Sequence, residues 1–279
     1  MEILPEDCIA SVLSRVSPRD ACRSAAVATF IRNALESELL WDKFLPPDYK
    51  EIIAKSVFPV TYKSKKELFF KLSSPLLIDE GLKTFSIHKA TGKKCYTLSA
   101  RNLYIAWSAN SLFWCWKTLP RSRFSEAVEL RMTSWLEIEG KVNTKTLSPN
   151  THYKAYLIVE VAHYRAFGLD VLPCEISIEV GVGGFHSRGK ILFSHNKHSN
   201  QSYEHIFHPN EIKECSRSKS GHEIARGSRD QRKDGWLEIE LGEFYNDATE
   251  KEVKMSLREV KGVHLKGGLV VDGIDIRPI

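Results

Sequence analysis

The densest cluster of aromatic residues runs from Trp107 to Trp116, where three tryptophans fall within ten residues. An indole face can stack on the apolar C–H face of a sugar ring, while the sugar's hydroxyl and acetamido groups need polar partners such as a glutamate. If a hairpin turn is centred on Asn110–Ser111, Trp107 faces Trp114 and Ile105 faces Trp116, all on one side. The cluster therefore predicts a carbohydrate-binding surface, with burial of the same tryptophans in a core as the alternative.

Two pairs of carboxylates could suggest glycosidase chemistry: Glu137 with Glu139, and Glu238 with Glu240. Residues two apart on one strand point the same way, so they need not flank a glycosidic bond from opposite sides. We expect both pairs of glutamates to lie on strand faces that are exposed to solvent. A nucleophile motif of the G-x-S-x-G type does not occur in the sequence. We therefore expect no catalytic residues and a protein that is not an enzyme.

A metal or cofactor site is also not indicated. His195 with His198 and His205 with His208 are each three residues apart, but they lie in a polar segment without nearby cysteines. The run Gly181–Gly184 departs from a dinucleotide-binding motif and is typical of a turn. We expect surface histidines, no metal and no cofactor.

The composition is that of a folded protein, with 279 residues, 42% hydrophobic and 27% charged. Six cysteines without a C-x-x-C pair indicate reduced thiols in the cytoplasm or nucleus. The acidic start lacks signal-peptide features, and no apolar run approaches the ~20 residues that span a bilayer. A net charge of +5 without a block of basic residues does not indicate nucleic-acid binding. We expect neither a membrane nor a nucleic acid as partner.

Residues 1–45 are predicted to form three short helices. Ser17 can cap a helix that has Pro18 in its first turn, and Asp20 can reach back as in a capping box. Such short helices bury too little apolar surface to be stable alone, so we expect them to pack on a partner or on the rest of the chain.

The remaining chain divides into a partly helical connector, 46–94, and an all-β domain, 95–279. From about residue 95 the apolar pattern has period two, and several intervals are too short for a helical crossover. One string occurs twice, Trp135–Glu139 and Trp236–Glu240, with Leu and Ile alternating against Trp and Glu. We predict an α+β chain overall, in which an antiparallel sandwich of the lectin-like jelly-roll kind follows a small helical domain.

Two sets of motifs resemble known families. The first comprises Leu4, Pro5, Ile9, Val12, Leu13, Val16, Pro18, Asp20, Val27 and Trp41. It resembles an F-box, in the variant of plant F-box proteins of the phloem-protein-2-like type. The second comprises Ser99–Leu103, Trp114–Lys117, Trp135–Ile138, Asp234–Phe244 and Gly273–Pro278. It is similar to the phloem-protein-2 or Nictaba-like lectin domain.

The resemblance implies roles for particular residues. In the lectin family two tryptophans and a glutamate bind N-acetylglucosamine oligomers, and these fall on Trp107, Trp114 and Glu252. The adaptor-binding residues implied by the F-box resemblance are Leu4, Pro5, Ile9, Leu13, Val16, Pro18, Val27 and Trp41.

The implied function is substrate recognition in an SCF-type cullin ubiquitin ligase. The partners would be a Skp-type adaptor, the cullin scaffold, and a glycan or glycoprotein target. In the alternative, the β-sandwich binds a protein epitope and has no carbohydrate activity. A stand-alone glycosidase is a third possibility that would need two facing carboxylates.

Overall fold

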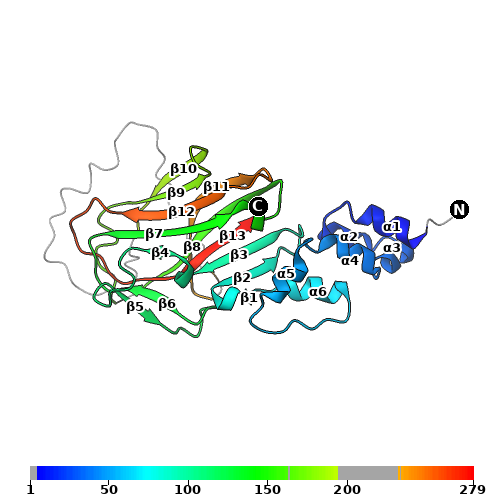
Figure 1. Cartoon of the computed structure of the whole chain (residues 1–279), viewed down its shortest axis with the longest axis horizontal. Coiled ribbons are helices and arrows are strands. Elements are labelled where there is room, and N and C mark those ends of the chain that lie inside the picture. The colour runs from blue at the N-terminus through cyan, green and yellow to red at the C-terminus, as the bar shows by residue number, and fades with distance from the viewer. Residues whose placement is uncertain (1–4, 163, 194–231, 233) are drawn as a thin grey trace.

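The structure, a computed structural model, describes residues 5–162, 164–193, 232 and 234–279. Helices gather at one end of an elongated molecule and an antiparallel β-sandwich forms the other end (Figure 1). The helices are α1 (Glu6–Leu13), α2 (Pro18–Ser24), α3 (Thr29–Ala34), α4 (Glu38–Phe44), α5 (Tyr49–Ala54) and α6 (Lys65–Leu72). None of these described helices has the length and apolar character needed to cross a membrane.

The first helices begin where the local sequence indicates. Ser17 caps α2 through a hydrogen bond that the Asp20 N–H donates to its Oγ (3.1 Å), which confirms the predicted cap. Residues 5–45 form four helices, and the prediction of three is wrong because the chain breaks between Ala34 and Glu38 to give α3 and α4. Leu35 and Ser37 lie in this break, and the Leu35 carbonyl accepts a hydrogen bond from the Trp41 indole (2.6 Å).

Trp41 of α4 forms the centre of the helical core. Its side chain is 1% exposed, and its ring centroid lies 5.6 Å from that of Phe44, 5.3 Å from Phe69 and 5.5 Å from Phe70. Phe69 and Phe70 belong to α6, outside residues 1–45. The first four helices therefore share an aromatic core with the connector rather than closing a core of their own.

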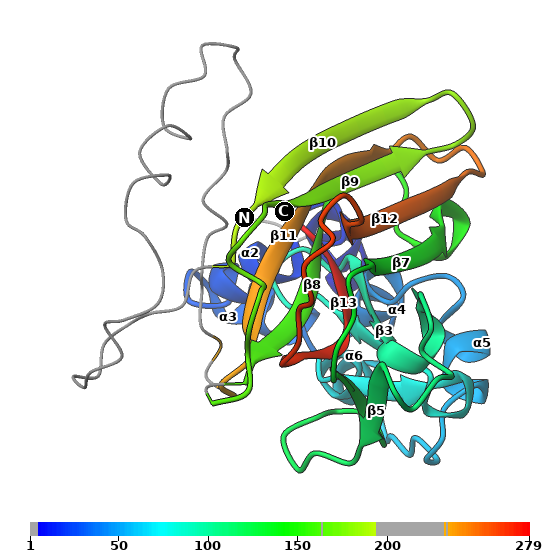
Figure 2. The same ribbon diagram turned by 90° about the vertical axis from the view of Figure 1, so that its left-hand side faces the viewer.

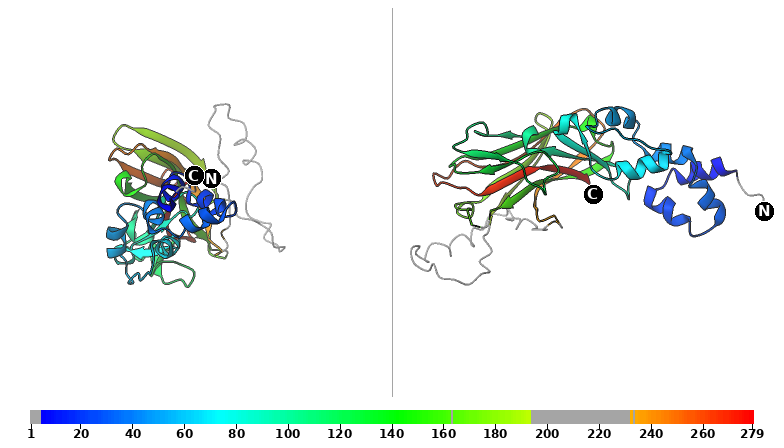
Figure 3. Two further views of the ribbon diagram at one scale, coloured as in Figure 1. Left: turned by 90° about the vertical axis from the view of Figure 1, so that its right-hand side faces the viewer. Right: turned by 90° about the horizontal axis from the view of Figure 1, so that it is seen from below.

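The connector is attached to the β-domain by a partly buried ion pair. Asp48 accepts a hydrogen bond from Lys94 Nζ (2.6 Å), and Lys94 is 5% exposed. The Tyr153 hydroxyl donates to the Lys94 carbonyl (3.1 Å) and accepts from the Ser148 N–H (2.9 Å). These contacts hold the start of the sandwich against the helices, which lie at one end of it, as the right-hand view of Figure 3 shows.

The strands begin earlier than the predicted boundary at residue 95. The strands are β1 (Leu76–Ile78), β2 (Lys83–Ile87), β3 (Lys94–Ser99), β4 (Tyr104–Ile105), β5 (Trp114–Lys117), β6 (Ala127–Leu130), β7 (Leu136–Asn143), β8 (Thr151–Val161), β9 (Cys174–Val180), β10 (Phe185–Ile191), β11 (Leu237–Asn246), β12 (Glu252–Glu259) and β13 (Leu269–Pro278). Single 3-10 turns are η1 (Asp79–Gly81), η2 (Ala100–Asn102) and η3 (Thr144–Thr146). β1 and β2 lie within the predicted connector but pair into the larger sheet.

The strands form two antiparallel sheets, as predicted. The larger sheet has the order β1-β2-β3-β13-β6-β5, with β8 joining β13 to β11, and the smaller has the order β10-β9-β12-β7-β4. Figure 2 shows β10, β9, β12 and β7 as one layer beside β11, β8 and β13. Within the described ranges, the edge strands β10 and β11 lie on the same side of the sandwich.

Alternation along the strands explains the core between the sheets. Leu136 and Ile138 of β7 are 0% exposed, and Ile239 of β11 is 5% exposed, so the two copies of the repeated string bury their aliphatic residues in one core. Trp236 is 1% exposed but packs in a separate small cluster with Ile158. The larger sheet is therefore covered locally on both faces.

We expect Trp41→Ala to lower the free energy of unfolding by about 3–5 kcal/mol, because a large ring is lost from a packed core. Leu39→Ala is the matched control on the same helix, since Leu39 is 62% exposed. Urea denaturation of the full chain measures both variants. Equal effects of the two substitutions would contradict the shared aromatic core.

Candidate functional site

The tryptophan cluster does not form the predicted hairpin. β4 pairs with β7 of the smaller sheet, whereas β5 pairs with β6 of the larger sheet, so the predicted pairing of Trp107 with Trp114 is wrong. The chain between them is a compact loop, in which the Trp114 N–H donates to the Asn110 carbonyl (3.0 Å). Trp107 has a φ of 66°, which takes it out of the extended conformation that a hairpin strand needs.

Trp114 is part of the core. Its side chain is 1% exposed, and its indole N–H donates to the Ala106 carbonyl (2.9 Å). Trp116 is half-buried, donates to the Ser108 carbonyl (3.1 Å), and has the Arg101 guanidinium 3.5 Å from its ring centroid. Both indoles therefore link the loop to β5 and leave little free face for a ligand.

Trp107, by contrast, is 59% exposed. Its ring centroid lies 6.3 Å from that of Phe113, and Leu112 in the same loop is 71% exposed. Left-handed backbone is uncommon for a bulky side chain and costs free energy, so the surrounding loop must hold it in place. An exposed, fixed indole of this kind can act as a stacking platform.

Glu252 lies at the other end of the smaller sheet. The Ala106 N–H donates to the Glu137 carbonyl (3.0 Å), and Glu137 is opposite Arg258 on β12. Glu252 comes six residues before Arg258 on that strand, which at about 3.3 Å per residue corresponds to roughly 20 Å. The structure thus does not bring Trp107, Trp114 and Glu252 together in one site.

The surroundings of Glu252 form a cleft of about 970 Å³. Its walls come from the β9–β10 hairpin, the end of β11 and the start of β12, together with His152 at the start of β8. Glu252 is 59% exposed and its Oε1 lies 3.1 Å from Lys141 Nζ. Sequence reasoning missed the other lining residues, because they come from segments far apart in the chain and share no local pattern.

The eight predicted adaptor-binding residues fall into two groups. Ile9, Leu13, Pro18 and Trp41 are buried and support the packing of the helices. Pro5, Val16 and Val27 are exposed, and Leu4 lies outside the described residues.

Further apolar side chains are exposed on α1, α3 and α4 and on the turns between the helices. Val12 is 63% exposed, Leu39 is 62% exposed and Phe30 is 44% exposed, while Val27 reaches 78%. Exposed apolar side chains at this density on short helices are typical of a surface that packs on another protein. We call Val12, Val16, Val27, Phe30 and Leu39 the helical apolar surface.

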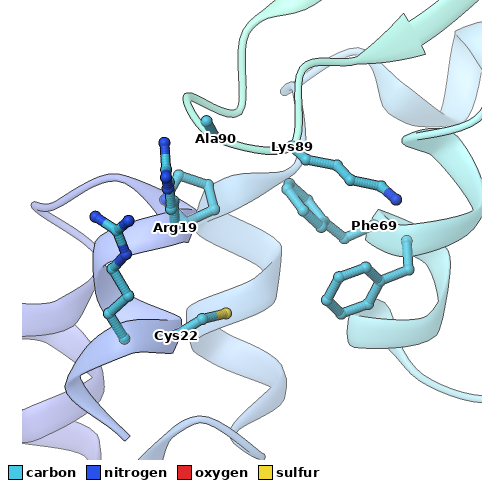
Figure 4. Close-up of a pocket in the computed structure, with 8 residues that line it drawn as sticks. Arg19, Cys22, Phe69, Lys89 and Ala90 are labelled. Atoms are coloured by element: carbon cyan, nitrogen blue, oxygen red, sulfur yellow. The ribbon is translucent and has the colours of Figure 1, made fainter.

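A groove of about 500 Å³ lies between α2, α6 and the turn after β2. Its lining is Pro18, Arg19, Cys22, Arg23, Phe69, Phe70, Lys89 and Ala90. Figure 4 shows the Cys22 sulfur pointing across the groove and the Lys89 side chain extending over it. Burial raises the pKa of the Cys22 thiol, and the nearby Lys66 opposes this effect. The groove thus combines an apolar floor with a cationic rim.

Two segments of the chain match known protein families. The F-box domain family matches residues 1–43, and the Phloem protein 2 family matches residues 93–278. The chain belongs to the F-box proteins with a phloem protein 2 domain. The F-box match covers α1 to α3 and most of α4, and the phloem protein 2 match covers β3 to β13. α5, α6, β1 and β2 lie between the two matched segments.

Relatives from Arabidopsis thaliana share this organisation along nearly their whole length. F-box protein PP2-B15 is 46% identical over 284 residues, which cover 99% of this chain and 96% of the relative. F-box protein VBF is 43% identical, and F-box protein PP2-B13 is 42% identical, each match covering 100% of this chain and 99% of the relative.

Metal binding finds no support in the part of the chain that the structure describes. No group of three or more His, Cys, Asp or Glu side chains is arranged there to hold an ion. His195, His198, His205 and His208 lie outside the described residues, so the prediction of surface histidines in the phloem protein 2 domain stays a prediction.

The two tryptophans should differ sharply in their effect on the stability of the phloem protein 2 domain. We expect Trp114→Ala to lower the free energy of unfolding by about 3–5 kcal/mol, and Trp107→Ala to change it by less than about 1 kcal/mol. Chemical denaturation followed by circular dichroism measures both. A Trp114→Ala variant as stable as the wild type would contradict its place in the core.

Proposed function

We propose that the protein is the substrate-recognition subunit of an SCF-type cullin ubiquitin ligase. Its F-box docks on a Skp-type adaptor, and its phloem protein 2 domain holds the target, in the cytoplasm or nucleus. The observation that carries the proposal is the helical apolar surface on an F-box joined to a separate β-domain.

The physical basis of adaptor docking is the burial of that surface. Val12, Val27 and Leu39 are each more than 60% exposed. Complete burial of one such apolar side chain contributes about 1.5–3 kcal/mol of favourable free energy to binding. The groove between α2 and α6, with Arg19, Arg23 and Lys89 on its rim, adds a place for an apolar segment that carries acidic residues. Both features support an interface with another protein.

In this proposal the protein performs no bond chemistry of its own. It raises the local concentration of a target beside the ubiquitin-charged enzyme, so its rate effect comes from proximity. The buried aromatic core shared by α4 and α6, together with the Asp48–Lys94 pair, supports a fixed spacing between adaptor and target.

We propose that the phloem protein 2 domain recognises a protein epitope on the target. A sugar site built from Trp107, Trp114 and Glu252 would need the three side chains to converge, and Trp114 is buried while Glu252 lies roughly 20 Å along the sheet. A glycan remains the second candidate, because Trp107 is exposed and held in a left-handed conformation. One indole can stack on one sugar ring, with weak affinity on the order of millimolar.

We expect Val27→Asp with Leu39→Asp to weaken adaptor binding at least tenfold, because two charges would be buried in the interface. Biolayer interferometry with a recombinant Skp-type adaptor measures the dissociation constant. The control is Leu112→Asp, which places a charge at a residue that is 71% exposed in the β-domain. Unchanged binding by the double variant, or binding that survives deletion of residues 1–45, would overturn the docking proposal.

A glycan array probed with the full chain separates the two target classes. A protein-epitope receptor gives no retention on any saccharide. If N-acetylglucosamine oligomers are retained and Trp107→Ala abolishes the retention without loss of stability, the glycan candidate replaces the epitope candidate. Retention that depends on Glu252 but not on Trp107 would instead place a sugar in the cleft at β12.

A further inference from the structure

A crevice of about 480 Å³ lies at the junction between the F-box helices and the β-sandwich, and we call it the junction crevice. Its walls come from the ends of α1 and α4, the start of α2, the turn between β2 and β3, and residues 147–149 after η3. The turn packs on α2, where the Arg19 N–H donates to the Ala90 carbonyl (3.5 Å). A space of this size can enclose a small molecule, which would contact both halves of the chain at once.

Four lysines from different segments line the junction crevice, and one carboxylate accompanies them. The lysines are Lys43 at the end of α4, Lys93 in the turn before β3, Lys94 at the start of β3 and Lys145 in η3, and the carboxylate is Asp48. Among the described residues, the lining contains no other acidic side chain.

Two of these lysines are already paired with carboxylates. Lys94 Nζ donates to Asp48 Oδ2 (2.6 Å), and Lys145 Nζ lies 3.5 Å from Oε2 of Glu250, a residue outside the lining. When Glu250 is counted, four lysines oppose two carboxylates. The junction crevice therefore keeps a net charge of +2 after its neighbours are included.

Lys43 and Lys93 supply this remaining charge. Neither side chain forms an ion pair or a hydrogen bond within the part of the chain that the structure describes. The backbones that carry them are close together, because a Cβ placed on Gly92 would lie 3.6 Å from the Phe44 carbonyl oxygen. Two unpaired ammonium groups at one crevice repel each other and attract an anion.

The lining also contains a buried hydroxyl group that can donate. Ser148 is 7% exposed, and its Oγ accepts a hydrogen bond from the Lys94 N–H (3.0 Å). Its own hydrogen has no acceptor among the described residues. Leu45 and Leu147, both buried, make part of the wall apolar. Apolar surroundings strengthen the attraction between an ammonium group and an anion.

We infer that the junction crevice binds a small organic phosphate. Oxygens of the phosphate group accept hydrogen bonds from Lys43, Lys93 and the Ser148 hydroxyl, and the carbon skeleton packs on Leu45 and Leu147. A phosphate monoester carries about two negative charges and three acceptor oxygens. This ligand is additional to the adaptor and the target, and the inference does not rest on the proposed function.

Charge and shape distinguish this ligand from other anions. A phosphate monoester balances the net charge of +2, whereas a single carboxylate balances half of it. Lysines act as separate point charges, and no arginine fork of the kind that matches a carboxylate belongs to the described lining. A nucleic acid needs a groove that follows its backbone, but these lysines surround one enclosed space. We expect the affinity to fall as salt is raised.

The test is isothermal titration calorimetry of the full chain with inorganic pyrophosphate at low salt. The wild type should bind, and Lys43→Glu with Lys93→Glu should weaken binding at least tenfold. The matched control is Lys50→Glu with Lys55→Glu, two exposed lysines outside the lining, which changes the net charge equally and should leave the affinity unchanged. Citrate, a carboxylate anion, should bind at least tenfold more weakly than pyrophosphate.

The milder pair Lys43→Gln with Lys93→Gln keeps the test valid if the charge reversal disturbs folding, and it should also weaken binding. Absence of wild-type binding, equal binding of citrate, or an equal loss in the control pair would overturn the inference.

A second arm identifies the source of the phosphate. The full chain is sedimented with phosphatidylcholine vesicles that contain phosphatidylinositol phosphate. Retention that pyrophosphate displaces, and that the Lys43 and Lys93 variants lose, assigns the site to a lipid headgroup. Pyrophosphate binding without retention on vesicles assigns it to a soluble phosphate. Retention that both lysine pairs reduce equally would show adsorption by overall charge and would count against the site.

Discussion

The burial of Trp41 against Phe69 and Phe70 is the contact on which the arrangement of the molecule depends. The F-box helices have six to eight residues each and cannot enclose a large core. α6 completes that core from outside the F-box match, and the Asp48–Lys94 pair then joins the connector to β3. The helical and β parts are thereby packed through a common element rather than joined by a free linker.

Local pattern was sufficient for much of the fold. Ser17 and Pro18 predicted the start of α2, and strict alternation at Leu136 and Ile138 predicted which face of β7 is buried. The early strands β1 and β2 were missed because Leu76–Ile78 is too short to show a period. The break after Ala34 was missed because the apolar spacing continues across it in the sequence.

The candidate site was less predictable, because its geometry depends on which sheet each strand joins. Spacing placed Trp107 beside Trp114, but β4 and β5 enter different sheets, and this pairing is decided by contacts distant in sequence. Glu252 followed from family resemblance alone, and no pattern linked it to Tyr245 or Phe185. The cleft beside Glu252 forms only when the ends of three strands and a hairpin meet in the folded sandwich.

The cleft opens at the end of the sandwich that is nearer to the helices. The Ile279 N–H donates to the carbonyl of His152 in the cleft wall (3.1 Å), and the C-terminus lies at the end that faces the helices (Figure 1). Trp107 lies at the opposite end. The packed junction between helices and sandwich sets how far each end of the sandwich lies from the F-box helices. A ligand at the near end would therefore be held closer to the F-box than one bound at Trp107.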